Sequence, residues 1–394
     1  MLQDPIVITG AARTPQGNML GSLSSLAAHE LGSIAIQAAT KRADIAAEHI
    51  EAAIMGCVLP AGQGQAPARQ AALNAGLTEK TGATTINKMC GSGMQAVIMA
   101  HDALAAESQQ VIVAGGMESM SNAPYLLAKA RQGYRFGHGE LKDHMLLDGL
   151  EDAYDKGKLM GYFADETAKK YHFSRETQDK FAQTSLERAI KASDDGSFAA
   201  EIVPVTINTR KGKQVIDRDE GPNPEKLSKI SRLKPAFQKE GTVTAANSST
   251  ISDGASALIL MRASTAKQFS VTPIAKICAH SSFAQAPAWF TTAPVGAIKK
   301  LLEKTGWNLN DVDLFEINEA FAVVTLAAMH DLDLPADKVN VHGGACALGH
   351  PIGCSGARII ITLIYALQQY QLKRGIAALC IGGGEATAVG IELL

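Results

Sequence analysis

The chain has 394 residues and a formal net charge of −2, with 46% hydrophobic and 19% charged residues. Nucleic-acid binding rests largely on a concentrated cationic surface, so this near-neutral balance gives no reason to expect a nucleic-acid partner. No apolar run approaches the roughly 20 residues that span a bilayer, and the strand DPIVIT, with its aspartate at position 4, leaves no room for a leader peptide. We therefore expect no membrane partner and a cytoplasmic location.

Six cysteines are spread along the chain without a CxxC pair and without the Cys/His spacing of zinc sites. Cys57 and Cys278 follow or lie within apolar, strand-like runs, where cysteine behaves as a small hydrophobic residue. We expect free thiols, no disulfides and no bound metal.

A set of landmarks occurs twice along the chain in the same order. In the first half a helix-like run opens at Gly32, an apolar strand IEAAIMGCV follows, and NKMCGSGMQA leads through an Ala-rich helix to a strand that closes on Gly115-Gly116. In the second half the matching features are a helix-like run from Gly296, the strand VDLFEINEAFA, the turn GHPIGCSGAR and a strand that closes on Gly382-Gly383. The four pairs of landmarks are separated by nearly the same number of residues, which indicates two copies of one α/β unit. Chance similarities would occur at scattered separations.

The segment between the two copies, residues 121–246, is richer in charge and in Tyr, Lys and Asp. Within it SRETQ places Ser174 as the N-cap of a helix, and a turn-rich piece, TRKGKQVIDRDEGPNPEKLSK, comes later. We interpret the segment as an inserted domain that covers one face of the core and carries part of a binding site. The predicted organisation is a first half made of residues 1–120 and 247–270, an inserted domain of residues 121–246, and a second half of residues 271–394.

Cys90 precedes Gly91-Ser92-Gly93 and a helix-like run, so its sulfur is expected at a helix N-terminus. The positive end of the helix dipole would favour the thiolate there, as in a nucleophilic cysteine. A small buried residue in a tight turn explains the same pattern equally well.

Three further residues lie at turns that the duplication makes equivalent or adjacent. His350, between Gly349 and Pro351, is either a solvated loop histidine or a catalytic one. Cys380 ends an apolar strand before three glycines, so it is either a core residue or lies where a substrate can approach the backbone. Asn318, followed by Glu319, interrupts an apolar passage as a helix cap or a functional amide. Such turns at the carboxyl ends of strands are where open α/β sheets bind ligands.

The motifs NKMCGSGMQA, NEAFA, GGACALGHPIGCSGAR and CIGGG closely resemble those of the thiolases, in the same order, and the resemblance extends over nearly the whole chain. It is strongest to the branch that acts on acetyl-CoA. The resemblance implies an α/β fold with a duplicated βαβαβαββ core, layered α-β-α-β-α, and an inserted loop domain. It also implies an acyltransferase without a cofactor, whose substrates are coenzyme A thioesters.

The same resemblance implies a role for each of the residues at these turns. Cys90 would be the nucleophile that carries the acyl group, and Cys380 the acid/base that removes the α-proton of acetyl-CoA. His350 would activate Cys90 and, with a water held by Asn318, line one oxyanion hole. The backbone amides of Cys90 and Gly382 would form the other.

Coenzyme A contacts follow from the resemblance as well. Ser249 in NSSTISDGA matches a serine near the pantetheine, and the other matching positions are Leu159, Met160, Phe237 and Phe321. The chain departs from the short-chain pattern where Leu159 replaces a histidine near the acyl pocket, which leaves the accepted chain length open. Further departures are Cys346 and Cys354, interpreted as packing changes, Glu385 after the glycines, and the loop RDEGPNP.

The leading hypothesis is reversible condensation of two acetyl-CoA molecules to acetoacetyl-CoA and coenzyme A through an acyl-cysteine. The alternatives are a broader 3-ketoacyl-CoA thiolase of fatty-acid β-oxidation and a non-catalytic subunit that binds acyl-CoA. A redox sensor using the thiols would leave the GHPIG loop unexplained. By resemblance the chain is expected to form a homotetramer, a dimer of dimers.

Overall fold

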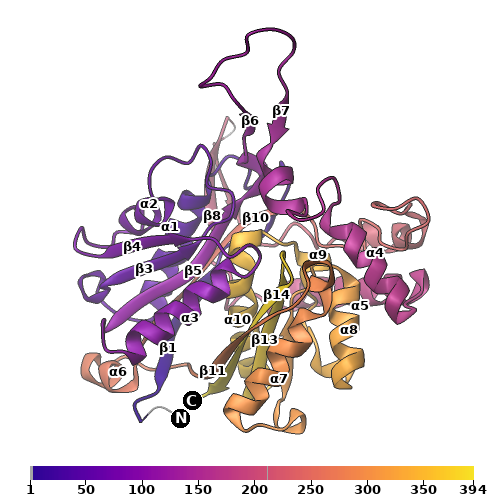
Figure 1. Ribbon diagram of the computed structural model, residues 1–394. Coiled ribbons are helices and arrows are strands. Elements are labelled where there is room, and N and C mark those ends of the chain that lie inside the picture. Colours follow the sequence, from indigo (N-terminus) through magenta and orange to yellow (C-terminus); the bar gives the residue numbers. More distant parts are fainter. Residues whose placement is uncertain (1–2, 211) are drawn as a thin grey trace.

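The computed structural model describes residues 3–210 and 212–394 and contains the repeated α/β unit twice (Figure 1). The first copy consists of β1 (Ile6–Arg13), α1 (Ala28–Arg42), β3 (Ala52–Gly56), α2 (Pro67–Asn74), β4 (Gly82–Ile86), α3 (Ser92–Ala105), β5 (Val111–Ser119) and β10 (Ser252–Arg262). The second consists of β11 (Ala275–Ala284), α7 (Ala293–Thr305), β12 (Leu314–Ile317), α8 (Ala322–Leu332), α9 (Ala345–Leu348), α10 (Ile352–Gln369), β13 (Arg374–Ile381) and β14 (Glu385–Leu393). Helix α6 (Ala263–Phe269) joins them, and the short β2 (Gly17–Asn18) pairs with β10.

The strand order shows the duplication directly. The first copy pairs its strands in the order β4-β3-β5-β10-β1, and the second in the order β12-β13-β14-β11. In the first copy the β4-β3 and β3-β5 pairings are parallel and the next two are antiparallel. In the second copy the β12-β13 pairing is parallel and the next two are likewise antiparallel. A single parallel bridge from Phe315 to Val339 occupies the place of β4 in the second copy. The two sheets meet where Val7 and Ile8 of β1 pair with β11. The predicted βαβαβαββ duplication is confirmed.

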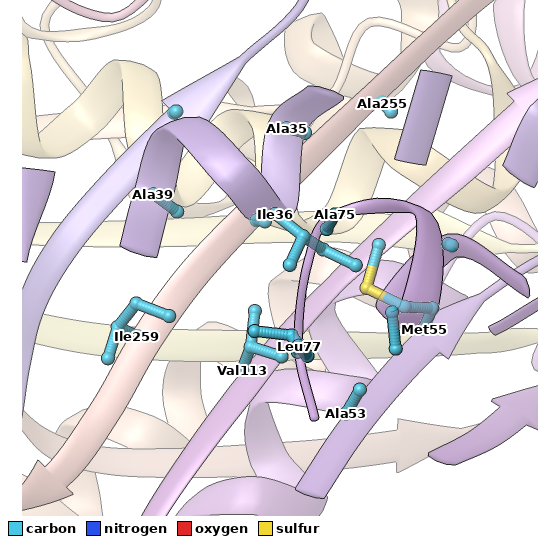
Figure 2. Packing of buried hydrophobic residues seen from close by; sticks show 14 of the residues in the cluster. Ala35, Ile36, Ala39, Ala53, Met55, Ala75, Leu77, Val113, Ala255 and Ile259 are labelled. Atoms are coloured by element: carbon cyan, nitrogen blue, oxygen red, sulfur yellow. The ribbon is translucent and has the colours of Figure 1, made fainter. Parts of the chain in front are cut away.

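Apolar residues alternate between two cores along the central strands of the first copy. Ala53 and Met55 of β3 face α1 and α2, where Ile36 and Leu77 pack over Val113 and Ile259 (Figure 2). The residues that alternate with these along β3 and β5 point to the other side of the sheet, toward α3 and α10. Both faces of these strands are therefore covered by helices, which explains why their residues are apolar on both faces.

Helices α3 and α10 form the central layer between the two sheets. They cross closely, because Gly93 of α3 and Gly356 of α10 leave no space for side chains: a Cβ on Gly356 would lie 2.4 Å from the amide nitrogen of Met94, and one on Gly93 would lie 2.9 Å from the amide nitrogen of Ala357. Helices α7 and α8 cover the outer face of the second sheet. The result is the expected α-β-α-β-α sequence of layers, with the N-termini of α3 and α10 side by side.

The segment between β5 and β10 contains its own elements. These are a 3₁₀ turn (Met120–Asn122), β6 (Tyr125–Leu127), β7 (Leu141–Asp143), a π-helical turn (Leu146–Leu150), α4 (Met160–Tyr171), α5 (Arg175–Asp194), β8 (Val205–Thr209), β9 (Gly212–Ile216) and a 3₁₀ helix (Pro224–Arg232). The hairpin of β6 and β7 projects away from the body of the molecule (Figure 1).

One contact stabilises a helix within this segment, and another fixes the segment on the core. Ser174 caps α5 as predicted, with its hydroxyl accepting the amide N–H of Thr177 at 3.2 Å. In the loop RDEGPNP, Asp219 forms a buried ion pair with Arg13 at 2.6 Å, and this pair holds the loop against β1. The division into domains stays a prediction.

Two expected boundaries differ. The strand predicted from VDLFEINEAFA ends at Ile317, because the residues from Asn318 to Phe321 turn into α8. The helix expected from Gly32 starts one turn earlier, at Ala28. No helix in residues 3–210 and 212–394 is long and apolar enough to cross a membrane.

Candidate active site

Cys90 lies in the turn between β4 and α3, one residue before the N-cap Gly91. The turn is tightly wound, since Met89 has a φ of 48°, a left-handed conformation that costs a non-glycine residue roughly 1 kcal/mol or more. The Ser92 hydroxyl accepts the amide N–H of Lys88 at 2.8 Å and donates to the carbonyl of Met89 at 2.6 Å. Cys90 as a whole residue is only partly buried, although its sulfur is enclosed by protein atoms.

The expected lowering of the Cys90 pKa is wrong for the free protein. Removal of the thiol from water raises its pKa to about 11, and this outweighs the hydrogen bonds from the backbone amides of Gly382 and of Cys90 itself, which act in the opposite direction. A helix N-terminus therefore does not by itself produce a thiolate here. Ionisation of Cys90 needs a base beside it.

Alkylation of Cys90 by iodoacetamide should accordingly depend steeply on pH. With a raised pKa the thiol form dominates near neutral pH, and the reactive thiolate grows about tenfold for each pH unit up to that pKa. Peptide mass spectrometry over a series of pH values measures the rate. A rate that is already constant from neutral pH upward would mean that the thiol is ionised in the free protein.

His350 lies in the turn between α9 and α10 and is only 6% exposed, which excludes the solvated alternative. Its Nδ1 is 2.5 Å from the hydroxyl oxygen of Ser355, which itself donates to the carbonyl of Pro351 at 2.9 Å. Since the Ser355 proton is used in that second bond, the hydroxyl accepts from Nδ1–H. Burial lowers the pKa of His350 to about 3, with a smaller contribution from the positive charge of Arg358. The imidazole is thus neutral, with a lone pair on Nε2 that can accept a hydrogen bond or a proton.

Asn318 is oriented toward that lone pair. The guanidinium of Arg358 can only donate, so its contact of 3.5 Å with the Asn318 Oδ1 fixes which end of the amide faces it. The Asn318 NH₂ group then faces Nε2 of His350, at 3.4 Å. A single assignment of protons therefore satisfies one chain of polar contacts, which runs from Arg358 through Asn318 and His350 to Ser355.

Ser355→Ala should lower kcat by about 10- to 100-fold with little change in KM, because the buried Nδ1–H loses its acceptor and the ring is no longer held in one tautomer. Steady-state kinetics measures both constants. Ser256→Ala is the matched control, since the Ser256 hydroxyl is also buried but donates to the carbonyl of Cys354, at 3.0 Å, and not to the imidazole. Equal losses in both variants would contradict a specific role for Ser355.

Cys380 is the penultimate residue of β13 and is fully buried. Burial raises the pKa of its thiol well above the ordinary value, and the charge of a Cys90 thiolate raises it further. The two thiols, one from each copy of the unit, are therefore close enough to influence each other's ionisation. The glycines after Cys380 form a turn with positive φ at Gly383 and Gly384, and this turn presents the amide of Gly382 to the Cys90 sulfur.

Most of the predicted coenzyme A contacts gather around Cys380. Met160, Phe237 and Phe321 belong to the same apolar cluster as Cys380, and the rings of Phe237 and Phe321 are 5.9 Å apart. Ser249 joins this group through its backbone, whose amide donates to the carbonyl of Ala320 at 2.9 Å. Leu159 is the N-cap residue of α4, directly before Met160, and is half-buried. Their roles as substrate contacts stay predictions.

Glu319 is a structural residue in this fold. Its carboxylate accepts hydrogen bonds from Ser185, from the Asn340 amide and from the backbone of Cys346, at 2.7 to 3.1 Å. It thereby holds α5 and α9 against the turn that contains Asn318. Cys346, one of the positions that depart from the family pattern, also contacts Glu319. Its thiol lies 3.7 Å from the backbone carbonyl of Glu319.

Sequence reasoning missed three buried charged residues that support the site. Glu118 accepts the amides of Val58, Leu59 and Gly353, and burial raises the pKa of its carboxyl group to about 7. Arg358 lies 3.8 Å from Glu316 in a fully buried pair. Each of the three interrupts an otherwise apolar stretch, which is the signal that could have identified them.

Comparison with known families identifies both copies of the unit. Residues 6–264 match the thiolase N-terminal domain and residues 271–393 the thiolase C-terminal domain. The relatives include acetyl-CoA acetyltransferase 2 of Arabidopsis thaliana, 49% identical over 99% of this chain and 97% of that protein. The acetyl-CoA acetyltransferase of Escherichia coli (strain K12) is also 49% identical, over 98% of this chain and 99% of the relative.

A solved structure agrees with these sequence matches. The crystal structure of the Bacillus anthracis acetyl-CoA acetyltransferase superimposes with a TM-score of 0.97 at 41% identity and covers 99% of both chains. Its similarity extends through both copies of the unit and the inserted segment. The chain belongs to the thiolase family.

Proposed function

We propose that the protein is an acetyl-CoA C-acetyltransferase, which reversibly condenses two acetyl-CoA molecules to acetoacetyl-CoA and coenzyme A. The observation that carries the proposal is the proximity of two thiols, Cys90 and Cys380, from opposite copies of the unit. His350, in the turn before α10, supplies a neutral and oriented imidazole. Relatives with this activity in their names match the chain over nearly its full length, which supports the same assignment.

In the first half-reaction, Nε2 of His350 takes the proton of Cys90, and the thiolate attacks the carbonyl carbon of acetyl-CoA. The imidazolium stabilises the thiolate that forms with it, which lowers the cost of ionising a thiol with a high pKa. The amides of Cys90 and Gly382 stabilise the oxyanion of the tetrahedral intermediate. The bond to the coenzyme A sulfur breaks, and the departing thiolate takes the proton of Cys380, which leaves an acetyl group on Cys90 and a thiolate on Cys380.

In the second half-reaction, the Cys380 thiolate removes an α-proton from a second acetyl-CoA. The enolate oxygen is stabilised by the imidazolium of His350 and by a water held on the Asn318 amide. The enolate carbon attacks the acetyl carbonyl, the bond to the Cys90 sulfur breaks, and His350 returns its proton to Cys90. No step changes an oxidation state, so the route needs coenzyme A thioesters as substrates and no redox cofactor.

Leu159 favours a second candidate, a thiolase that also accepts longer chains. It provides an apolar side chain at the start of α4, next to Met160 in the cluster around Cys380. Coenzyme A-dependent loss of the acetoacetyl-CoA enolate absorbance, measured beside 3-ketohexanoyl- and 3-ketodecanoyl-CoA, separates the two. Rapid loss with acetoacetyl-CoA alone is the expected result. Comparable kcat/KM values on the longer substrates would assign the protein to fatty-acid β-oxidation, and no turnover on any substrate would favour a non-catalytic acyl-CoA binding subunit.

Assembly as a homotetramer, a dimer of dimers, is part of the proposal. The projecting segment around β6 and β7 exposes large apolar side chains, with Phe136 102%, Tyr125 66% and Leu141 64% exposed. Exposed apolar surface concentrated on a projecting element is typical of a protein interface. A cytoplasmic location stays a prediction, since the similar proteins include the E. coli enzyme and others named as mitochondrial.

A further inference from the structure

A compact group of metal-ligand side chains lies outside the candidate active site, toward the far end of α3. Asp102 Oδ1 is 2.9 Å from Nδ1 of His101 and 2.8 Å from Nε2 of His280. The two imidazole rings are nearly perpendicular, at 79°, with their centroids 4.9 Å apart. One ligand atom from each of the three residues lies within 4.8 Å of the others. Asp102 is about 15 Å along α3 from the first residue of the helix, Ser92, at a rise of about 1.5 Å per residue.

We propose that His101, Asp102 and His280 form a binding site for a divalent transition-metal ion of the Zn²⁺ type. Two imidazole nitrogens and one carboxylate oxygen form a donor set that suits such ions better than it suits Mg²⁺ or Ca²⁺, which prefer oxygen ligands. Without an ion, a single carboxylate oxygen must accept from both imidazoles. An ion placed between the three atoms would replace both hydrogen bonds, after each imidazole moves its proton to the other ring nitrogen, so binding needs no change in net protonation.

The surroundings allow an ion to enter while the protein holds the ligands. The Asp102 side chain is 59% exposed, whereas those of His101 and His280 are 12% and 20% exposed. The imidazoles are thus held by packing, and the open side of the carboxylate leaves room for water to complete the coordination. A nearby cation, Lys304, points at the main chain, because its Nζ donates to the backbone carbonyl of His280 at 2.9 Å.

The ligands come from both copies of the duplicated unit. His101 and Asp102 belong to α3 of the first copy and His280 to β11, the first strand of the second. Because His280 is 178 residues from Asp102, the spacing of residues along the sequence gave no sign of the site. An ion bound here would tie the central helix layer to the second sheet and stabilise the folded protein by mass action. The site takes no part in the proposed chemistry.

Titration of the chelator-treated, full-length protein with ZnCl₂ near neutral pH tests the site by calorimetry and by thermal unfolding. The expected result is one binding event and a higher Tm, with the affinity at least about tenfold weaker in His280→Ala and in Asp102→Asn. His330→Ala is the matched control, because His330 forms the same neighbouring pair with Asp331, at 2.9 Å, and no third His, Cys or carboxylate ligand joins that pair in the part of the chain that the structure describes.

Three further outcomes are decisive. Binding that is unchanged in His280→Ala and Asp102→Asn, for example binding of Zn²⁺ to the free thiols, would overturn the proposal. So would equal losses in those variants and in the His330 control. Co²⁺ gives an independent signal, since visible absorption of a four- or five-coordinate Co²⁺ complex should appear in the unaltered protein and in His330→Ala but not in Asp102→Asn. Circular dichroism shows whether each variant is folded.

Discussion

Cys90→Ala is expected to lower the rate of acetoacetyl-CoA thiolysis by about 10⁴-fold or more. The variant lacks the thiol that attacks the substrate and carries the acyl group. The loss should appear in kcat, since the alanine side chain leaves the apolar cluster of Met160, Phe237 and Phe321 in place for substrate binding. The substitution removes a single sulfur atom, so it leaves little cavity and the protein should stay folded. Loss of the enolate absorbance measures the rate.

Cys278→Ala provides the control for removal of a thiol. Cys278 is also a half-buried free cysteine, but it lies within β11 and not at the turn before α3. This variant should keep nearly full activity. Retained thiolysis in Cys90→Ala would show that another group carries the acyl chain.

Cys380→Ala should separate the two half-reactions. Transfer of the acetyl group to Cys90 should continue, because coenzyme A thiolate is a good leaving group and solvent can protonate it. Removal of the α-proton should slow by about 10²- to 10⁴-fold, the usual contribution of a positioned general base. The readouts are exchange of the acetyl-CoA α-protons with deuterated solvent and formation of acetoacetyl-CoA.

Cys354→Ala is the control for this second variant. Cys354 is a buried thiol in α10 that lies 3.2 Å from the Ser256 hydroxyl. Any loss from an altered core should therefore appear in both variants, while loss of proton exchange should be confined to Cys380→Ala. Failure of Cys380→Ala to form the acetyl-enzyme would contradict the division of roles.

The duplicated fold could be predicted because its signals are local and repeated. Two glycine-rich turns, each followed by a helix and a strand that closes on paired glycines, specify the same unit twice, and the structure pairs the strands of both copies in the same order. The Ser174 cap was predictable for the same reason, since capping depends on a few neighbouring residues. The end of β12 at Ile317 was harder to predict from the sequence. The turn at Asn318 that follows it is held by Glu319 and by contacts from distant segments.

The ionisation of the site could not be predicted from local sequence. A cysteine before a helix suggested a lowered pKa, but burial by both halves of the molecule dominates and raises the pKa of Cys90 to about 11. The orientation of His350 depends on Ser355 and Arg358 of α10 and on Asn318 in the turn after β12. Such chains of hydrogen bonds join residues that are close only in the folded protein, and the positions of those residues along the sequence do not show this. The His101, Asp102 and His280 group was missed for this reason too.

Capture of the acyl-enzyme tests the central claim most directly. The protein is mixed with acetyl-CoA, quenched in acid and digested, and the peptides are examined by tandem mass spectrometry. Our account predicts one added acetyl group, located on Cys90, that disappears when coenzyme A is added before the quench. An acetyl group on Cys380 or on another residue, or no stable acylation although acetoacetyl-CoA is formed, would contradict it.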